Sequence, residues 1–424
     1  MQFPADSILL ADNLLPSQLL DMDRQRVQAI CLAEGGVTSH VAILAISMQL
    51  PMLVAAGDGV LQIEDGTMLV LDAELGELEV GPDEQRQQVF ETRAAEQASR
   101  RDADWAAASQ ACVTRDGVTV HIEANLASAA DAREAVKAGA EGCGLLRTEF
   151  LFMGRPAAPG LDEQLAVYGE ISAALGQRPL VVRTLDAGGD KPIEYLNQKE
   201  EENPALGVRG IRLSLERESL LETQLDALLS LRHDGDLQVM IPMVSSVGEV
   251  KAVRRMLEQR AEAKGVSVNV QLGIMIETPA AAVIADRLAP LVDFFSIGTN
   301  DLTQYTLCMD RGEARLASRL DVLHPAVLTL IRRTVEAADA ASIPVAVCGG
   351  AAGDMLAAPV LLGLGVRRLS MPASLIPAQK ARLRDWRIED CEALAREVLA
   401  LPSARMVRTR VREKVLAPRM GEDS

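Results

Sequence analysis

The chain lacks a patterned set of cysteines, a long apolar run and an excess of positive charge, and each absence excludes a class of protein. Its six cysteines are scattered, without CxxC spacing or a histidine cluster, which excludes a disulfide framework and a zinc site and favours a reducing, cytoplasmic location. The longest apolar region, residues 41–57, is interrupted by polar residues and a proline, and no signal segment opens the chain, so no membrane insertion is expected. A formal net charge of −17 argues against nucleic acid as a partner.

Composition and apolar pattern divide the chain into three parts. A content of 48% hydrophobic and 24% charged residues is typical of a globular enzyme, and 424 residues suffice for two or three domains. Residues 1–81 alternate short strand-like and helical segments, which predicts a small α/β domain. Residues 82–111 are rich in Glu, Gln, Arg and Ala and predict a solvated helix or helical hairpin that acts as a linker. Residues 112–424 make up the third part.

This third part alternates strand-like runs with amphipathic helical segments. Eight strands are expected, at residues 118–125, 142–148, 179–185, 237–243, 271–277, 293–298, 343–348 and 366–371. Eight successive βα units predict a TIM (β/α)8 barrel, and a last amphipathic segment, from Glu389 to about Leu416, is expected on its outside. In that fold functional side chains gather at the C-terminal ends of the strands, so the residues there are candidates for an active site.

A histidine lies where a helix is expected to start, in the stretch GGVTSHVAIL at residues 35–44. The two glycines allow a tight turn after the strand-like run at residues 27–32, and Thr38 and Ser39 are favoured N-cap residues. His40 is therefore expected in the first helical turn, where backbone N–H groups and the helix dipole would stabilise a phosphoryl group on the imidazole. Taken alone, a histidine more often caps a turn or fills a surface notch.

Two carboxylates follow neighbouring strands of the expected barrel. Glu277 ends the fifth strand and Asp301 follows the sixth. Hard oxygen ligands on adjacent strands suit Mg²⁺, which takes one or two carboxylates together with oxygens of a substrate. The alternative is a pair of loop carboxylates bonded to the local backbone.

Basic side chains from separate loops are expected to face these carboxylates if the barrel closes. They are Arg147, Arg183, Arg209, Arg311 and Lys191. Guanidinium forks bind phosphate and carboxylate in bidentate fashion, so the cluster predicts a site for a small, highly anionic substrate. Each arginine taken alone is more often a surface ion pair.

One cysteine is placed differently from the other five. Cys348 ends the seventh strand and precedes two glycines, which suggests room around the thiol at the rim. A buried, inert cysteine is the commoner case. If the reaction leaves an enolate in this site, the thiol could donate a proton to its carbon.

Several longer stretches resemble one known family. They are the stretch at residues 35–45, LLRTEFLFM at 145–153, RTLDAGGDK at 183–191, NPALGVR at 203–209, ETPAA at 277–281, residues 293–305, and Cys348-Gly349. Together they resemble enzyme I of the sugar phosphotransferase system, the phosphoenolpyruvate–protein phosphotransferase, from about residue 7 to the C-terminus.

This resemblance implies an activity and a role for each matching residue. His40 would be phosphorylated by phosphoenolpyruvate, Cys348 would donate the proton, and Glu277 and Asp301 would bind Mg²⁺. The substrate-binding residues would be Arg147, Arg183, Arg209, Arg311, Lys191 and, for the substrate carboxylate, Asn300. The phosphoryl group would pass to the phosphocarrier protein HPr, and the family dimerises through its barrel, which implies a homodimer.

The chain departs from the family at two places. Most members have Cys-Gly-Glu where this chain has Cys348-Gly349-Gly350, so a carboxylate beside the thiol is absent, which is consistent with a paralogue fused into a multiphosphoryl transfer protein. The helical subdomain that docks HPr, and the strand before it, are not expected in a chain that opens just before the histidine domain. We therefore expect an N-terminally truncated histidine domain that passes phosphate to HPr poorly.

Other functions remain open from the sequence alone. A fragment of pyruvate phosphate dikinase or phosphoenolpyruvate synthase shares the histidine domain and barrel, but no Gly-rich nucleotide loop is present. A Mg²⁺-dependent pyruvate-enolate aldolase can carry a similar Glu-Thr-Pro-Ala strand end, yet it has no use for a histidine domain. A regulatory module that senses phosphoenolpyruvate without turnover is the third alternative.

Overall fold

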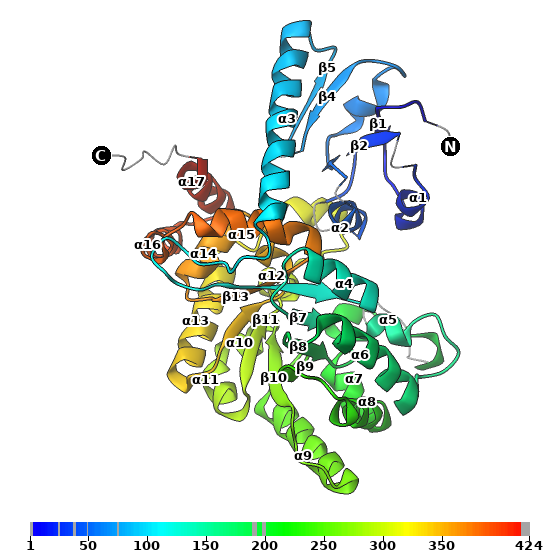
Figure 1. The fold of residues 1–424 in the computed structure, drawn as a ribbon, viewed down its shortest axis with the longest axis vertical. Helices are drawn as coiled ribbons and strands as arrows, with labels where there is room; N and C mark the ends of the chain where they lie inside the picture. The colour runs from blue at the N-terminus through cyan, green and yellow to red at the C-terminus, as the bar shows by residue number, and fades with distance from the viewer. Residues whose placement is uncertain are drawn as a thin grey trace. The chain divides into compact units, whose positions relative to one another are not determined.

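The computed structural model describes residues 3–23, 26–36, 40–48, 50–73, 76–188, 193–196 and 201–416 (Figure 1). Its contacts divide the chain into two compact units. The first unit comprises Met1–Ala107 and Leu307–Leu320, and the second comprises Ala108–Thr306 and Asp321–Ser424.

The first unit is built on a three-stranded parallel sheet with the order β1-β2-β3. Its elements are β1 (Ser7–Ala11), α1 (Pro16–Leu20), β2 (Val27–Leu32), α2 (His40–Ser47) and β3 (Met52–Leu53). The central strand β2 is almost continuously apolar because both of its faces are covered. Val27 and Ile30 pack with α1 and α2 on one face, whereas Ala29 and Cys31 pack with Val60 on the other. The small α/β domain expected from the sequence is thus present.

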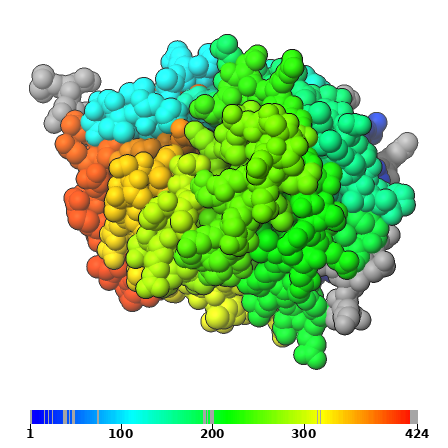
Figure 2. All heavy atoms as spheres, turned by 90° about the horizontal axis from the view of Figure 1, so that it is seen from below, coloured from blue at the N-terminus to red at the C-terminus, as the bar shows by residue number. Residues whose placement is uncertain are grey.

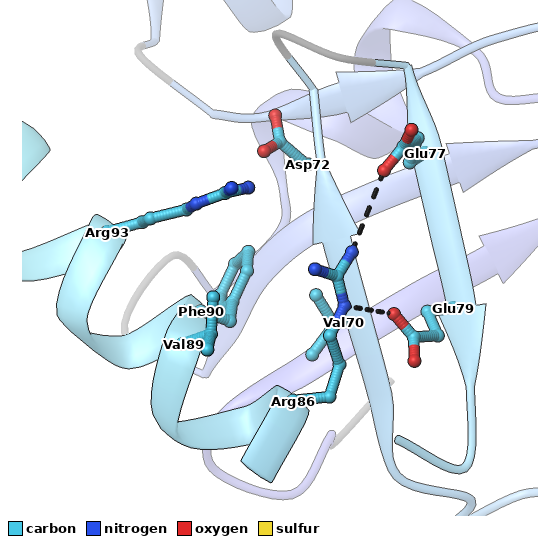
Figure 3. Close-up of a pocket in the computed structure, with 8 residues that line it drawn as sticks. All are labelled: Val70, Asp72, Glu77, Glu79, Arg86, Val89, Phe90 and Arg93. Carbon is cyan, nitrogen blue, oxygen red and sulfur yellow. Dashed lines mark hydrogen bonds and ion pairs between the residues drawn. The ribbon is translucent and has the colours of Figure 1, made fainter. Parts of the chain in front are cut away.

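An antiparallel hairpin and a long helix complete the first unit. They are β4 (Leu69–Asp72), β5 (Glu77–Val80) and α3 (Glu84–Ala106). Figure 3 shows Arg86 of α3 reaching the hairpin, where its guanidinium pairs with Glu79 at 2.5 Å and with Glu77 at 3.8 Å. None of the residues of α3, all of which the structure describes, is buried. The polar linker segment is therefore one solvated helix, one of the two forms expected from the sequence.

The second unit is a closed barrel of eight parallel strands, each hydrogen-bonded to its neighbours in chain order. The strands are β6 (His121–Leu126), β7 (Cys143–Leu146), β8 (Leu180–Arg183), β9 (Leu237–Ile241), β10 (Gln271–Ile276), β11 (Phe294–Ile297), β12 (Val345–Val347) and β13 (Arg368–Met371). Seven of them lie within segments that the sequence predicted as strands, and β6 ends one residue beyond its predicted segment, so the TIM barrel is confirmed.

Helices alternate with these strands and cover the barrel. They are α4 (Ala129–Lys137), α5 (Glu149–Phe152), α6 (Leu161–Leu175), α7 (Ile211–Glu216), α8 (Glu218–Ser230), α9 (Val247–Lys264), α10 (Pro279–Val283), α11 (Ala285–Leu288), α12 (Thr299–Leu307), α13 (Pro325–Ala341), α14 (Ala357–Gly363), α15 (Ile376–Arg384), α16 (Ile388–Val398) and α17 (Ala404–Leu416). Figure 2, seen from below, shows residues drawn in green to yellow-green over the middle of that face. Within the described residues no helix is both long and apolar enough to span a membrane.

A buried lysine fixes the point where the chain enters the barrel. The Lys380 ammonium group, on α15, donates to the carbonyl oxygens of Ala108, Gln110 and Gly139 at 3.1, 3.2 and 2.7 Å, and it pairs with Glu141 at 3.0 Å. A buried ammonium is tolerated only when its protons have such partners. The segment that follows α3 is thereby fastened to the barrel by its backbone.

Candidate active site

The histidine of the first unit lies at the helix start that the sequence predicted. Helix α2 begins at His40, after a turn in which Gly35 has a φ of +98°. A residue with a Cβ would be strained at that φ, which explains the glycine. Thr38 and Ser39, the expected N-cap residues, lie outside the described residues, as does the side chain of His40.

The barrel brings seven of the predicted site residues to the C-terminal ends of its strands. Arg147, directly after β7, and Asn300, in the first turn of α12, are partly buried, and the other five are as follows. Arg183 ends β8, Glu277 directly follows β10, Asp301 lies in the first turn of α12 after β11, and Cys348 directly follows β12. Arg209 comes from the loop before α7. All five are buried. Buried charges persist only when paired, so their partners determine what this cluster can do.

Arg209 is held between two carboxylates. Its guanidinium donates to both oxygens of Asp186, at 3.2 and 3.0 Å, and to Oδ1 of Asp301 at 3.3 Å. It also donates to the Tyr305 hydroxyl at 3.2 Å, and that hydroxyl in turn donates to the Ala205 carbonyl. Burial alone would lower the pKa of Arg209, but Asp186 and Asp301 outweigh it and raise the pKa. The loop at 203–209 is thus attached to α12 by hydrogen bonds.

Arg183 has its own carboxylate partners. It forms an ion pair with Glu149, the first residue of α5, and another with Asp186 at 3.3 Å. Neither Glu149 nor Asp186 was assigned a role from the sequence, although each lies inside a stretch that carried the family resemblance. The available signal was their spacing, since Asp186 stands three residues after Arg183 and Glu149 two residues after Arg147. Two buried arginines therefore face four buried carboxylates.

Glu277 sits where these charges meet. Its Oε1 accepts a hydrogen bond from the Met243 N–H at 2.6 Å, and Met243 adopts a left-handed φ of +58° at the end of β9. Burial, then Asp301 and Asp186, raise the pKa of Glu277, while Arg183 and Arg209 lower it. A bound cation would offset the repulsion between carboxylates clustered in this way.

The thiol of Cys348 is tightly enclosed by other side chains. Only 3% of the residue is exposed, so the expectation of space around it was wrong: the sulfur packs among barrel side chains and approaches the Ile297 carbonyl at 3.8 Å. Burial raises the pKa of Cys348 to about 11, although the Ser296 hydroxyl, Arg183 and Arg147 lower it. At neutral pH the group is a protonated acid, and Arg147 lies close enough to influence it.

Asn300 and Gly350 are joined by a hydrogen bond beside this thiol. The Gly350 N–H donates to the Asn300 side-chain oxygen at 2.9 Å. A Cβ built on Gly350 would lie 3.2 Å from that same oxygen, so a side chain there requires only a small shift of Asn300. The position can therefore accept the glutamate that most family members carry.

Two of the predicted substrate-binding residues are not among the residues of this cluster. Arg311 belongs to Leu307–Leu320, which groups with the first compact unit. Lys191 lies outside the described residues. Their roles stay predictions.

The donor set suits a hard divalent cation. Within the described residues no group of three or more His, Cys, Asp or Glu side chains is arranged to hold a metal ion. Glu277 and Asp301 nevertheless place two carboxylates close enough together for Asp301 to raise the pKa of Glu277. Mg²⁺ commonly binds one or two carboxylates and completes its shell with substrate oxygens and water, so the residues fit it.

A further carboxylate lies inside the barrel, away from the rim. Glu123 on β6 is 3% exposed and pairs with Arg368 on β13 at 3.6 Å. A Cβ on Gly144 would come within 2.5 Å of its Oε2, so glycine leaves the space that the carboxyl group fills. Burial raises the pKa of Glu123 to about 7, against the lowering effect of Arg368.

This shift predicts a pH-dependent stability. Folding raises the pKa of Glu123 from about 4.5 in the unfolded chain to about 7. The protonated carboxyl group therefore contributes fully to stability below pH 4.5, and this contribution is lost as the pH rises through about 7. Relative to Glu123→Gln, the wild-type free energy of unfolding should fall by about 3 kcal/mol across that window. Urea denaturation at several pH values measures the difference. The exposed Glu134→Gln is the control, and parallel curves for wild type and Glu123→Gln would contradict the prediction.

Comparison with known proteins places the chain among relatives with the same two parts. Residues 101–388 match the family model described as the PEP-binding domain of PEP-utilising enzymes, and residues 3–76 match their mobile domain. A multiphosphoryl transfer protein of Rhodobacter capsulatus is 45% identical, over 95% of this chain and 49% of that protein, and one of Xanthomonas campestris is 46% identical, over 95% and 48%. A phosphoenolpyruvate-protein phosphotransferase of Haloferax volcanii is 43% identical, over 93% and 70%.

The chain spans about half the length of the two multiphosphoryl transfer proteins and about two thirds of the phosphotransferase. The match extends over both compact units, from the mobile domain through the barrel. The chain therefore belongs to the family of PEP-utilising enzymes, together with phosphoenolpyruvate-protein phosphotransferases.

Proposed function

We propose that this chain transfers the phosphoryl group of phosphoenolpyruvate to His40 and releases pyruvate. The observation that carries the proposal is the cluster at the strand ends of the barrel, where Arg183, Arg209, Glu277, Asp301 and Cys348 are buried together. The cluster offers cations for an anionic substrate, hard oxygens for a metal ion and an acid for the enolate. An enzyme that uses phosphoenolpyruvate needs all three of these groups, and the chain belongs to such a family.

The arginines bind the anionic groups of the substrate. Arg209 and Arg183 are oriented by Asp186 and Glu149, so their guanidinium planes are fixed before substrate arrives. Pre-orientation of this kind reduces the entropy lost on binding. Arg147, Arg311, Lys191 and Asn300 are proposed to complete the contacts, with Asn300 on the substrate carboxylate.

Glu277 and Asp301 are proposed to hold Mg²⁺. When bound, the ion neutralises negative charge that develops on the transferring phosphoryl group. The two carboxylates are well placed because Met243 fixes the orientation of Glu277 and Arg209 that of Asp301. Their oxygens supply the hard ligands that this ion prefers.

Cys348 supplies the proton that converts enolpyruvate to pyruvate. As the phosphoryl group leaves, the electron pair of the enolate attacks the thiol proton, so a C–H bond forms at C3 and the S–H bond breaks. A pKa near 11 keeps the thiol protonated at neutral pH, as an acid requires. The thiolate that remains is stabilised by Arg183 and Arg147, which lower the pKa of this group.

The phosphoryl group is proposed to pass from His40 to an HPr-type phosphocarrier of the sugar phosphotransferase system. The relatives named phosphoenolpyruvate-protein phosphotransferase support a protein as the acceptor. We also propose a cytoplasmic homodimer formed through the barrel. The histidine domain of residues 1–81 would have to visit the barrel of residues 112–424 and leave again, with residues 82–111 as the linker that permits this motion.

The carboxylates provide a test of this function. Glu277→Gln and Asp301→Asn should each lower the rate of pyruvate formation from phosphoenolpyruvate by about 100-fold or more, because charge stabilisation of the transferring group is lost. Calorimetric titration with Mg²⁺ should show the loss of binding directly. The exposed Asp286→Asn on α11 is the matched control. Full activity of a double variant without metal would rule the metal site out.

A further inference from the structure

The interior of the barrel contains a small cavity that the proposed reaction does not use. It has a volume of about 10 Å³, and Glu123, Ser296, Gln238 and Arg368 are among the residues that line it. That is the least space that holds one water molecule, and a buried water needs polar partners of the kind these side chains supply. A buried carboxylate, a hydroxyl and room for one water therefore lie together inside the barrel.

Ser296 connects this cavity with the thiol. The Ser296 hydroxyl is wholly buried and has no hydrogen-bond partner among the described residues. It nevertheless lies close enough to Cys348 to lower the pKa of the thiol. Their strands are neighbours, since the Cys348 N–H donates to the carbonyl of Ile297, the residue after Ser296. One hydroxyl thus faces both the cavity and the sulfur.

Arg368 marks the other end of the cavity. The Arg368 side chain is 29% exposed and the Glu123 side chain 4%, so the ion pair connects the barrel interior with solvent. Two further titratable groups lie close enough to Glu123 to interact with it through their charge: Glu141 raises the pKa of Glu123, and Glu123 raises that of the Cys143 thiol. Lys380 pairs with Glu141 at 3.0 Å and offsets its charge. Arg368 is thus the cation that stabilises Glu123 in its ionised form.

A buried thiol that gives up its proton must recover one before it can act again. We propose that Glu123 and Ser296 form a proton relay that returns a proton from the Arg368 side of the barrel to Cys348. This inference rests on the proposed function, in which Cys348 protonates the enolate. It makes Glu123 and Ser296 positioning and relay residues, since neither touches the substrate.

The relay moves one proton and leaves every group as it began. The Ser296 O–H bond breaks as an S–H bond forms on the Cys348 thiolate, and the cavity water donates a proton to the Ser296 oxygen. The Glu123 carboxyl group donates its proton to that water and remains as a carboxylate paired with Arg368. A proton from solvent then restores the carboxyl group. A pKa near 7 allows Glu123 both to donate and to be recharged.

Isotope exchange tests the relay separately from the overall rate. The chain is incubated in D₂O with Mg²⁺, phosphoenolpyruvate and ¹³C-labelled pyruvate, and NMR follows two quantities. One is the passage of label from pyruvate into phosphoenolpyruvate, which counts turnovers in both directions. The other is deuterium appearing in the pyruvate methyl group, which counts turnovers in which the thiol proton has exchanged with solvent.

In wild type, deuterium uptake should keep pace with label passage. In Glu123→Gln and in Ser296→Ala the ratio of deuterium uptake to label passage should fall about tenfold or more, because the abstracted proton returns to the same carbon. Gln238→Met, which alters the same cavity without touching the relay, should retain the wild-type ratio. A purely structural role of Glu123 would slow label passage and leave the ratio unchanged.

The outcomes separate the relay from the function on which it rests. Unchanged ratios in both Glu123→Gln and Ser296→Ala would overturn the relay and show that the thiol recovers its proton from the substrate side. A wild-type chain that passes no label between pyruvate and phosphoenolpyruvate would overturn the proposed function, and the relay with it.

Discussion

Replacing Arg209 by methionine should lower the free energy of unfolding by about 3–5 kcal/mol and abolish measurable binding of phosphoenolpyruvate. Arg209 is 2% exposed and contacts Asp186 and Asp301, so its removal takes a cation away from two buried carboxylates beside Glu277, although Asp186 keeps its ion pair with Arg183. The stability is lost because buried negative charges remain after their cation is removed. The ion pair itself contributes little net stability, because its attraction is largely offset by the cost of desolvating both charges. Urea denaturation and calorimetric titration measure the two effects.

The control for Arg209→Met is Arg217→Met. Arg217 is exposed at the start of α8, a few residues further along the chain, and the same substitution there removes a charge without uncovering a buried carboxylate. It should change the free energy of unfolding by less than about 0.5 kcal/mol. Equal effects of the two substitutions would show that the buried charge network does not hold this end of the barrel together.

Replacing Cys348 by serine should leave the affinity for phosphoenolpyruvate unchanged but slow pyruvate formation by about 100-fold or more. A hydroxyl is a far weaker acid than a thiol, even when burial has raised the pKa of that thiol to about 11. Loss of phosphate from the substrate would then produce free enolpyruvate, which becomes pyruvate in solution. Rapid-quench kinetics that follow pyruvate and the phosphoryl group on His40 separately distinguish the two steps.

Cys112→Ser is a matched control for Cys348→Ser. The Cys112 thiol is also buried, also approaches a backbone carbonyl at 3.8 Å, and also has a pKa raised by burial to about 11. Its partner is Lys380, away from the strand ends that hold the substrate site. Cys112→Ser should therefore leave turnover unchanged. An unimpaired Cys348→Ser enzyme would mean that another group protonates the enolate.

The barrel could be predicted from the sequence because its strands are buried on both faces. Segments such as 237–243 and 271–277 are nearly continuous apolar runs. Their regular alternation with helical segments is compatible with few folds besides a closed β/α barrel. The polar residues that interrupt those runs at their C-terminal ends, among them Glu277 and Cys348, were for the same reason recognisable as site candidates.

The partners of the charged residues could not be predicted in this way. Sequence spacing shows that Asp186 and Glu149 stand near arginines, but a buried arginine can face any carboxylate that the fold brings close. The same limit explains the burial of Cys348: the glycines after it suggested room, whereas barrel side chains such as Met240 and Met275 pack around the sulfur. Glu123 is a third case, because nothing in its strand indicates that Arg368, 245 residues later, will face it.

The most direct test of the proposed function is the position of the phosphoryl group after the chain meets labelled phosphoenolpyruvate and Mg²⁺. Acid-labile label should appear on His40, in step with the release of pyruvate, and His40→Ala should take up none. Mass spectrometry of the peptide that contains α2 locates the group. Pyruvate released without label on His40, or label on another residue, would contradict the account.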